Sequence, residues 1–458
     1  MSSGRDSDSS TIDVHSVDLL ILATWIIPVI PENRVFNDCA IAINDGIIIA
    51  IVPRAEAAKQ FVATQSVDLS GHILIPGLIN SHGHAAMSLL RGYADDLPLQ
   101  QWLEQHIWPA EGRFVDRDFV HAGAQLALAE MIRAGTTCFT DMYFFPDVTA
   151  ACAQQAGMRA QICAPILDFP TVWAQNADDY IDKALVVHDD FRSSDLVAVG
   201  FGPHAPYTVS DPAFKRIAVL SEELQAPVHI HLHETAGEVA RAVQDTGTRP
   251  IQRLRNLDVL SPLTQCVHMT QVDASDITLL QQSGAHVVHC PESNLKLASG
   301  FCPLARLLDS GINVAIGTDG AASNNDLNLF GELQSAALLA KAVAEDASVV
   351  NAHQALRLAT INGAIAMGKD SILGSLEVGK QADITAIAVN DIETTPMFDP
   401  VSHCVYTNNA HRVSHVWVNG KALLVDRKLQ TLNEKEILQQ ARDWQNRIKG
   451  GPHPPAMS

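Results

Sequence analysis

Eight apolar segments constrain the fold of this chain more than any other feature. Most of them are followed by a longer stretch of helical periodicity. The first lies within HILIPGLINSHGH (residues 72–84) and the last is NVAIGTDG (313–320). Amphipathic stretches such as DFVHAGAQLALAEMIRAG (118–135) fill most of the gaps. Alternating strands and helices predict a parallel sheet covered by helices. Eight such units predict a (β/α)8 barrel, with a doubly wound open sheet as the alternative. The other six segments lie at 136–142, 159–168, 196–206, 227–234, 264–269 and 286–293.

Short strands separated by turns precede and follow this region. Asn-Asp-Gly at 44–46 and Asn-Gly at 419–420 are typical hairpin turns. HCVYTN (403–408) is interpreted as one of the later strands. Because the two blocks are alike, we expect one small β-sandwich domain built from both chain ends. The predicted organisation is a disordered tail at 1–16, the first part of the β-sandwich at 17–75, a metal-dependent barrel at 76–373, the second part of the β-sandwich at 374–430, and a helix with a tail at 431–458.

The composition excludes several classes of function. The chain has 458 residues, of which 47% are hydrophobic and 18% charged, so it can bury a large core. A net charge of −20 argues against nucleic acid and anionic membrane surfaces as partners. The polar, acidic start does not resemble a signal peptide, and the apolar stretch at 17–30 is too short to span a bilayer. The eight cysteines are scattered without a C-x-x-C pair, so we expect a cytoplasmic enzyme or binding protein without a disulfide framework.

Ionisable side chains gather where the apolar segments end, which is where barrels of this kind build their active sites. His82 and His84 lie one residue apart, so both side chains would project from the same face of a strand. Each residue alone could be a hydrogen-bonded strand terminus, but together they predict a metal site. Imidazoles and carboxylates without thiolates favour zinc or another divalent ion. The further strand-end residues are Asp141, Asp168, His204, His229, His231, His233, Glu234, His268, His289 and Asp319.

A catalytic zinc site requires three or four protein ligands and one open position for water. The two histidines of the first strand, one histidine from HIHLH (229–233) and Asp319 would supply four. Alternate residues of a strand share one face, so spacing alone does not choose among the three histidines of that segment.

Five segments carry a resemblance to a known family. PGLINSHGH, HIHLHET, CVHM, SNLKLASG and GTDGAASNNDLNLF resemble the amidohydrolase superfamily and, more narrowly, the 5′-methylthioadenosine/S-adenosylhomocysteine deaminases. The resemblance runs in order from Val17 to Asp426. It implies a zinc-dependent hydrolase of cyclic amidines, which converts adenosine-type nucleosides such as 5′-methylthioadenosine, adenosine and S-adenosylhomocysteine to an inosine-type product and ammonia.

The resemblance also implies roles for single residues. In that family the ligand of the fifth strand stands three residues before a glutamate, which matches His231 and leaves His229 and His233 in supporting roles. Binuclear relatives carry a carbamylated lysine after the fourth strand, but GFGPHAP (200–206) has none, so we expect one ion per chain. No role is implied for His289. The implied set is His82, His84, His231 and Asp319 as metal ligands, Asp319, Glu234 and His268 as catalytic residues, and Glu111, His204, Glu234 and Asp319 as substrate contacts.

Alternatives remain within and outside this chemistry. The substrate could be another nitrogen heterocycle, as for guanine deaminases or triazine chlorohydrolases. A non-catalytic scaffold is the alternative from another class, although such proteins usually lose metal ligands and this chain keeps every position. The resemblance further implies a homo-oligomer whose partner is a small-molecule nucleoside, with neither nucleic acid nor membrane involved.

The segment after the third barrel strand predicts the substrate preference. Family members that accept S-adenosylhomocysteine carry arginines there, whereas residues 161–182 contain no arginine or lysine and place Ala164 and Pro165 where the first arginine would fall. A buried carboxylate without a cationic partner is unfavourable. We therefore expect 5′-methylthioadenosine to be preferred, adenosine to follow closely and S-adenosylhomocysteine to be clearly poorer. The alternative is that Arg91 or Arg113 reaches the same place.

Overall fold

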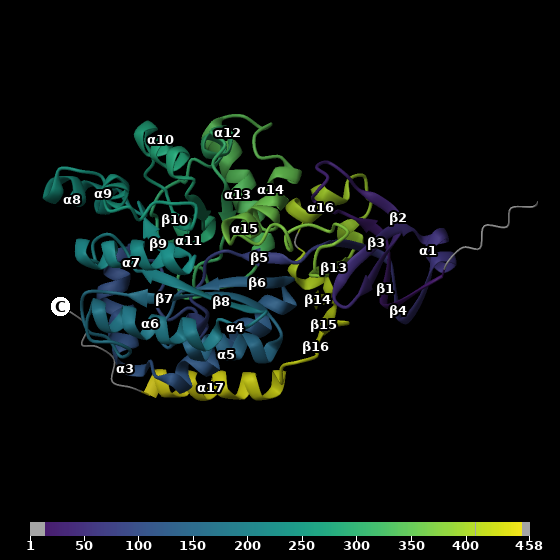
Figure 1. The fold of residues 1–458 in the computed structure, drawn as a ribbon, viewed down its shortest axis with the longest axis horizontal. Coiled ribbons are helices and arrows are strands. Elements are labelled where there is room, and N and C mark those ends of the chain that lie inside the picture. The colour runs from purple at the N-terminus through teal and green to yellow at the C-terminus, as the bar shows by residue number, and fades with distance from the viewer. Residues whose placement is uncertain (1–13, 408, 451–458) are drawn as a thin grey trace, which may run out of the picture.

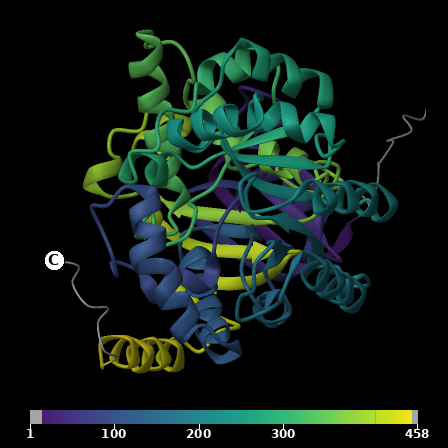
Figure 2. The same cartoon turned by 90° about the vertical axis from the view of Figure 1, so that its left-hand side faces the viewer.

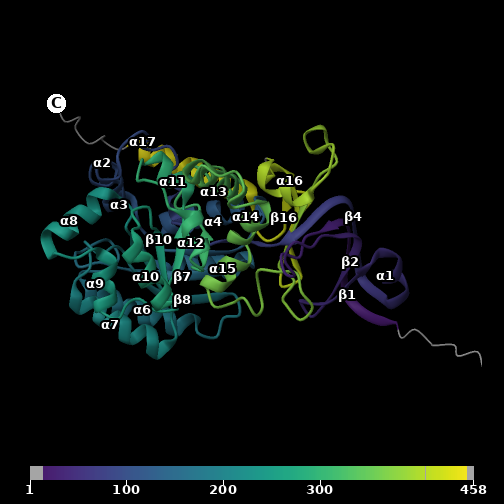
Figure 3. The ribbon, with the colours of Figure 1, turned by 90° about the horizontal axis from the view of Figure 1, so that it is seen from above.

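The computed structural model of the protein describes residues 14–407 and 409–450. Two eight-stranded sheets organise this part of the chain, and they lie side by side in Figures 1 and 3. The first sheet is parallel and runs in sequence order from β5 to β12, with helices around it. The second combines strands from both chain ends. The prediction of a (β/α)8 barrel with a second β unit from both ends is confirmed. The expected tails fall largely on residues 1–13 and 451–458, which lie outside the described residues.

The barrel closes between its first and last strands. The backbone N–H of Ser81, just after β5, donates to Ile316 O on β12 at 2.9 Å. Every neighbouring pair from β5 to β12 is parallel. The barrel strands are β5 (Leu78–Asn80), β6 (Thr136–Asp141), β7 (Arg159–Ile166), β8 (Val197–Pro203), β9 (Val228–Leu232), β10 (Thr264–His268), β11 (His286–His289) and β12 (Val314–Ile316).

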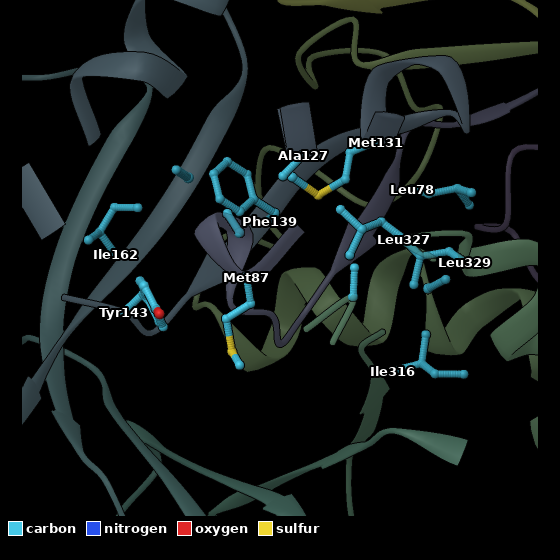
Figure 4. Packing of buried hydrophobic residues seen from close by; sticks show 14 of the residues in the cluster. Leu78, Met87, Ala127, Met131, Phe139, Tyr143, Ile162, Ile316, Leu327 and Leu329 are labelled. Carbon is cyan, nitrogen blue, oxygen red and sulfur yellow. The ribbon is translucent and has the colours of Figure 1, made fainter. Parts of the chain in front are cut away.

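Helices cover the outside of the barrel, because its strands are buried on both faces and their outward-facing apolar side chains need a second layer. Figure 4 shows this packing, with Leu78 of β5 and Phe139 of β6 near Ala127 and Met131 of α4. The covering helices are α4 (Arg117–Arg133), α5 (Pro146–Ala156), α6 (Ala177–Phe191), α7 (Asp211–Leu224), α8 (Ala236–Thr246), α9 (Pro250–Asn256), α10 (Ala274–Ser283), α11 (Pro291–Lys296), α12 (Leu304–Asp309), α13 (Leu329–Ala344), α14 (Ala352–Leu358) and α15 (Ile361–Ala366).

Between β5 and α4 the chain forms short helical turns that lie over the carboxyl ends of the strands. One of them has π-helical geometry. This geometry is rare in proteins, and where it does occur it is frequently found at functional sites. These turns are η1 (Ala85–Leu90), α2 (Leu99–Trp102), η2 (Leu103–Ile107) and α3 (Trp108–Phe114).

The second sheet has the order β16-β15-β14-β13-β4-β1-β2-β3. Both expected hairpin turns have positive φ at their two central residues, Asp45-Gly46 and Asn419-Gly420, as type I′ turns require. Its elements are β1 (His15–Ile26), β2 (Phe36–Asn44), β3 (Ile47–Pro53), α1 (Arg54–Gln60), β4 (Phe61–Pro76), β13 (Ile384–Ala388), η3 (Ile392–Thr394), η4 (Ala410–Arg412), β14 (Val413–Val418), β15 (Lys421–Val425) and β16 (Lys428–Leu429).

The first expected barrel strand is divided between the two sheets. HILIP completes β4, which pairs with β1 and β13, and the barrel strand β5 has only three residues. Gly77 separates them, and a Cβ there would lie 2.1 Å from Thr137 Oγ1, so only glycine fits this close passage. A continuous apolar run does not reveal where the chain changes sheet. The domain boundaries given above stay predictions.

The strand predicted at 403–408 is wrong, because a helix, α16 (Pro400–Tyr406), occupies most of it. Asp399 caps this helix by accepting a hydrogen bond from Val401 N at 2.9 Å, and Pro400 takes its first position. An aspartate followed by proline is a strong helix start, and here it outweighs the strand preference of valine and tyrosine.

The C-terminal helix α17 (Glu434–Gly450) packs against the barrel layer rather than the second sheet. Figures 1 and 2 show it along the outer edge beside the helical layer that contains α4. Trp444 of α17 meets Phe119 of α4 with ring centroids 5.2 Å apart. None of the helices in the described residues has the length and apolar character that a membrane span requires.

Candidate active site and metal centre

The carboxyl ends of the barrel strands bring four predicted ligands together. His82 Nε2 and His84 Nε2 each lie 3.2 Å from Asp319 Oδ1. The rings of His82 and His231 have centroids 5.0 Å apart. Ligand atoms of His82, His84 and Asp319 all lie within 4.8 Å of one another, and so do those of His82, His231 and His268. Such a cluster of imidazoles and one carboxylate has the donors and spacing that a divalent ion needs.

His82 and His84 do not project from a strand as expected, because β5 ends at Asn80. Both histidines lie in the loop that follows. Their rings still converge, with centroids 4.8 Å apart. The buried carboxylate of Asp141, at the end of β6, holds this loop by accepting a hydrogen bond from Ala85 N at 2.6 Å.

The hydrogen bonds of the ring nitrogens prepare two of the histidines for a cation. His84 Nδ1 lies 2.6 Å from Met142 O, and His231 Nδ1 lies 2.7 Å from His204 O. A carbonyl oxygen only accepts, so each Nδ1 carries a proton and Nε2 is the atom left for a metal. Without a metal, the Asp319 carboxylate outweighs burial and raises the pKa of His84 to about 9, so a metal would displace a proton from His84 Nε2. Burial lowers the pKa of His231 well below its usual value, which favours the neutral form that binds metals.

His82 is the most enclosed of these ligands. Its Nε2 is buried and has no hydrogen-bond partner among the residues that the structure describes. Burial lowers its pKa to about 4 even beside the Asp319 carboxylate. A buried nitrogen without a partner is unfavourable in a folded protein, and a bound cation would satisfy it. The residues present therefore fit a divalent metal.

Asp319 presents one carboxylate oxygen to the histidines and the other to two hydroxyl groups. Its Oδ2 accepts from Ser293 Oγ at 2.6 Å and from Ser323 Oγ at 2.9 Å. Burial alone would raise its pKa, but the adjacent imidazoles of His82 and His84 outweigh burial and hold the pKa well below its usual range. Asp319 is therefore an ionised carboxylate with a fixed orientation.

Glu234 and His268 lie beside this cluster. His268 Nε2 is 3.8 Å from Glu234 Oε2, and Ser299 Oγ is 3.4 Å from Glu234 Oε1. Burial raises the pKa of Glu234, so its carboxyl group keeps a proton more readily than an exposed glutamate. A carboxyl group of this kind can act as a general acid.

Glu111 and Tyr143 form a polar pair on the wall of the cavity. The Tyr143 hydroxyl donates to Glu111 Oε1 at 2.7 Å. Burial raises the pKa of Glu111 to about 7, against the opposing effect of the tyrosine hydrogen bond. Glu111 is thus not the exposed helix residue that its sequence context alone would favour. Its free oxygen can accept hydrogen bonds from a ligand.

His204 presents a hydrogen-bond acceptor to the same cavity. Its Nδ1 is 3.0 Å from Thr208 Oγ1, and that hydroxyl donates to Ala205 O at 3.1 Å. Because the hydroxyl proton is already used, His204 Nδ1 must be the donor of this pair. The neutral ring then has its lone pair on Nε2. Burial lowers the pKa of His204 to about 4, which keeps the ring neutral.

A cavity of about 280 Å³ connects these groups. Most of its wall is apolar, and among the described residues no lysine or arginine lines it. Pockets of this kind orient a small ligand with a few polar groups set in an apolar wall. The apolar and aromatic lining residues are Met87, Leu99, Trp102, Leu103, Ile107, Trp108, Met142, Tyr143, Phe144, Pro165, Leu167, Phe169, Pro170, Val172, Tyr207 and Leu297.

Two of the other strand-end histidines use both ring nitrogens in hydrogen bonds. His233 Nδ1 lies 3.0 Å from Gln271 O, and His233 Nε2 accepts from Ile251 N at 3.2 Å, so neither nitrogen is available to a metal. His229 bonds His82 through one nitrogen and Gln265 through the other. His289 is buried, and its Nδ1 has no partner among the described residues.

Several residues at the site were not found from the sequence. Glu238 accepts hydrogen bonds from the backbone N–H groups of His233 and Glu234, at 3.1 and 2.7 Å, while Thr235 caps the same helix. The spacing T-x-x-E is a capping-box signal and could have revealed this glutamate. Tyr143, Ser293, Ser323 and Gln265 carry no comparable signal in a single sequence.

The fold and this cluster are together typical of metal-dependent hydrolases. The family model described as "Amidohydrolase family" matches residues 73–423. A 5-methylthioadenosine/S-adenosylhomocysteine deaminase of Saccharophagus degradans is 56% identical over 432 residues, covering 94% of this chain and 97% of the relative. The chain therefore belongs to the amidohydrolase family and, within it, to the 5-methylthioadenosine/S-adenosylhomocysteine deaminases.

Solved structures agree with this membership. The crystal structure of an adenosine deaminase from Xanthomonas campestris with bound zinc has a TM-score of 0.94 and 46% identity, covering 96% of this chain and all of that one. An atrazine chlorohydrolase from Arthrobacter aurescens, complexed with zinc, has a TM-score of 0.86 at 23% identity, covering 93% and 99% of the two chains. The second likeness shows the fold alone.

Proposed function

We propose that this protein is a zinc-dependent hydrolase that deaminates adenosine-type nucleosides, with 5′-methylthioadenosine as its preferred substrate. The observation that carries the proposal is the position of Glu234, a buried carboxyl group, beside a cluster of histidines and Asp319 at one end of an apolar cavity. The deaminase names of its relatives support the same reaction. The product is the inosine-type nucleoside, and ammonia leaves.

The metal site we propose holds one zinc ion through His82, His84, His231 and Asp319. A zinc ion bound there would lower the pKa of a water molecule toward neutrality and so provide a nucleophile. Metal analysis of the pure enzyme tests this site, with one ion per chain expected at full activity. Two ions per chain at full activity would contradict it, and so would a His231→Ala protein that keeps its metal.

The chain's own residues divide the proton transfers between them. Asp319 accepts a proton from the attacking water, because its carboxylate is ionised and hydroxyl groups hold its orientation, and it passes this proton to the departing amine, which leaves as ammonia. Glu234 donates a proton to the ring nitrogen beside the attacked carbon, as a buried carboxyl group with a raised pKa can do. His268, 3.8 Å from Glu234, orients the attacking water.

The ribose hydroxyls bind to Glu111 and His204 in this proposal. Both groups present acceptors to the cavity, as a vicinal diol with two donors requires. Tyr143 holds Glu111 in place through its hydroxyl group.

The preference for 5′-methylthioadenosine follows from the wall of the cavity. Phe169, Pro170 and Val172 line it, and no described lysine or arginine does. Arg91 pairs with Glu130, and the Arg113 guanidinium lies 4.7 Å from the Phe114 ring centroid, so neither lines the cavity. A methylthio group suits such a wall, while the carboxylate of S-adenosylhomocysteine would lack a cationic partner.

A panel of nucleosides followed by ultraviolet absorbance tests the reaction and its preference together. We expect kcat/KM to be highest for 5′-methylthioadenosine, slightly lower for adenosine and clearly lower for S-adenosylhomocysteine. A preference for S-adenosylhomocysteine would refute the proposal that the apolar wall of the cavity selects the methylthio group. It would leave the proposed deaminase reaction intact. Turnover of guanine or a chlorotriazine, but of no adenosine, would refute the reaction. We further propose a cytoplasmic location and a homo-oligomer, which light scattering on the purified protein would test.

A further inference from the structure

A chain of buried hydrogen bonds leads from the backbone to the metal cluster. Gln265 Nε2 donates to Ala366 O at 2.6 Å. Gln265 Oε1 lies 2.7 Å from His229 Nδ1, and His229 Nε2 lies 2.7 Å from His82 Nδ1. The side chains of Gln265, His229 and His82 are at most 1% exposed, so water does not compete for these bonds.

The direction of every bond in this chain follows from its first member. Ala366 O can only accept, which fixes the amide of Gln265 with its nitrogen toward the backbone and its oxygen toward His229. An amide oxygen only accepts, so His229 Nδ1 carries a proton. In the neutral ring His229 Nε2 is then an acceptor, and His82 Nδ1 must donate to it. His82 therefore has its lone pair on Nε2, the atom that faces Asp319 at 3.2 Å.

A second amide holds the first link in this orientation. Gln161 Nε2 donates to Gln265 Oε1 at 2.9 Å, and Gln265 Nε2 donates in return to Gln161 Oε1 at 3.3 Å. These two side chains come from β7 and β10, which are separated by two strands in the barrel. This series of hydrogen bonds thus begins at a backbone carbonyl, and its first side chain is held by a second amide from another barrel strand.

We propose that His229 is a positioning residue that fixes the tautomer and ring orientation of the metal ligand His82. Most metal-binding histidines donate their second N–H to a carbonyl, a carboxylate or water, as His84 and His231 do here. His82 instead uses a second imidazole, whose ring lies edge to edge with it at an interplanar angle of 26°, with ring centroids 5.0 Å apart. Without that acceptor, the neutral ring could place its proton on Nε2 and block the metal.

This inference rests on the metal site proposed above. His229→Phe removes the acceptor while keeping an aromatic ring in the space. His229→Gln keeps the polarity, because the amide can accept from His82 and donate to Gln265. His233→Phe is the matched control, since His233 is also a buried histidine of this segment but its ring bonds Gln271 and Ile251 and lies 3.6 Å from Asp276. The zinc dissociation constant is measured for each protein by competition with a chromogenic chelator, with the thermal midpoint of each zinc-free protein beside it.

We expect His229→Phe to bind zinc about 10- to 100-fold more weakly, the range for loss of a partner of a metal ligand. His229→Gln should recover most of this affinity, and His233→Phe should bind zinc as the parent does even where its thermal midpoint falls. Parent-like affinity in His229→Phe, equal loss in both phenylalanine variants, or no recovery in a folded His229→Gln protein would each overturn the inference. A parent protein that binds no zinc would instead refute the proposed function.

Nitrogen NMR of the zinc-free parent reports the tautomer of His82 directly. With ¹⁵N-labelled histidine, the signals of His82 are identified by their loss in His82→Asn. We expect a protonated Nδ1 and an unprotonated Nε2 for His82. The opposite tautomer, or exchange between the two, would overturn the inference while leaving the metal site itself intact.

Discussion

Glu234 combines three properties that a proton donor to a purine ring needs. It is buried, its pKa is raised by burial, and it lies beside the cluster of metal ligands without being one of them. Its backbone is held by Glu238 and its carboxyl group by Ser299. The neighbours of the proposed proton donor thus fix its position.

The first prediction distinguishes the role proposed for Glu234, proton donation, from the role proposed for Asp319, which also binds the metal. Glu234→Gln should lower kcat about 100- to 10,000-fold, because an amide cannot deliver a proton to the ring nitrogen. Zinc content and thermal midpoint should stay close to those of the parent. Asp319→Asn is the contrasting variant, which should lose activity and also bind zinc more weakly. A Glu234→Gln enzyme within a few-fold of the parent rate would mean that another group donates the proton.

The second prediction concerns the hydrogen bonds of Glu111. Glu111→Gln should lower kcat/KM for adenosine about 10- to 100-fold, since hydrogen bonds to a charged group contribute about 1.5–3 kcal/mol each. With 2′,3′-dideoxyadenosine, which lacks both hydroxyls, the parent and the variant should differ by less than about threefold. Steady-state kinetics of both enzymes on both nucleosides measure the coupling. An equal loss on both substrates would show that Glu111 does not contact the ribose.

At the scale of single elements, periodicity predicted the barrel but not where its strands begin and end. The apolar run at 72–80 serves two sheets, and only the close approach of Gly77 to Thr137 marks the change. His82 and His84 were expected together, and they are, although a loop rather than a strand brings them together. Strand spacing left three histidines at 229–233 equivalent, because the difference lies in hydrogen-bond partners from distant segments.

The N-terminus of α8 illustrates how one helix positions the proposed proton donor Glu234. Glu238 accepts from the backbone N–H groups of His233 and Glu234, and Glu238 N in turn donates to Thr235 Oγ1 at 3.2 Å. This reciprocal pair is a variant of the capping box, and it fixes the turn that carries Glu234.

The third prediction tests this turn. Glu238→Ala should lower kcat about 10- to 100-fold through misplacement of Glu234, because small displacements near the reacting atoms have large effects on rate. The free energy of unfolding should fall by about 1 kcal/mol, as for loss of a helix cap. Glu223→Ala, an exposed glutamate of α7, is the control and should change neither quantity. Parent activity in Glu238→Ala would mean that the turn keeps its shape without the cap.

At the scale of the whole molecule, the two sheets meet at the amino-terminal ends of the barrel strands, away from the active site. Thr385 of β13 donates to Gly135 O, just before β6, at 2.7 Å. Arg159 begins β7, and its guanidinium binds Asp383 through two bonds of 2.8 and 3.1 Å. In barrels of this kind the amino-terminal face serves stability, whereas the opposite face carries the chemistry.

The last prediction follows from this separation of stability and chemistry. Arg159 and Asp383 have side chains only 6% and 5% exposed, so removal of one partner leaves a buried charge unpaired. Asp383→Ala should therefore lower the free energy of unfolding by about 3–5 kcal/mol. The double variant Arg159→Met/Asp383→Leu should recover most of that loss, because replacing a buried ion pair by apolar side chains is often neutral.

Urea unfolding at neutral pH measures the free energy of unfolding of both variants. The zinc content and kcat of each folded variant should stay at parent values, since the ion pair touches no residue of the active site. A loss of zinc in folded Asp383→Ala would show that the second sheet shapes the metal site, and the two ends of the barrel would then have to be treated as one coupled unit.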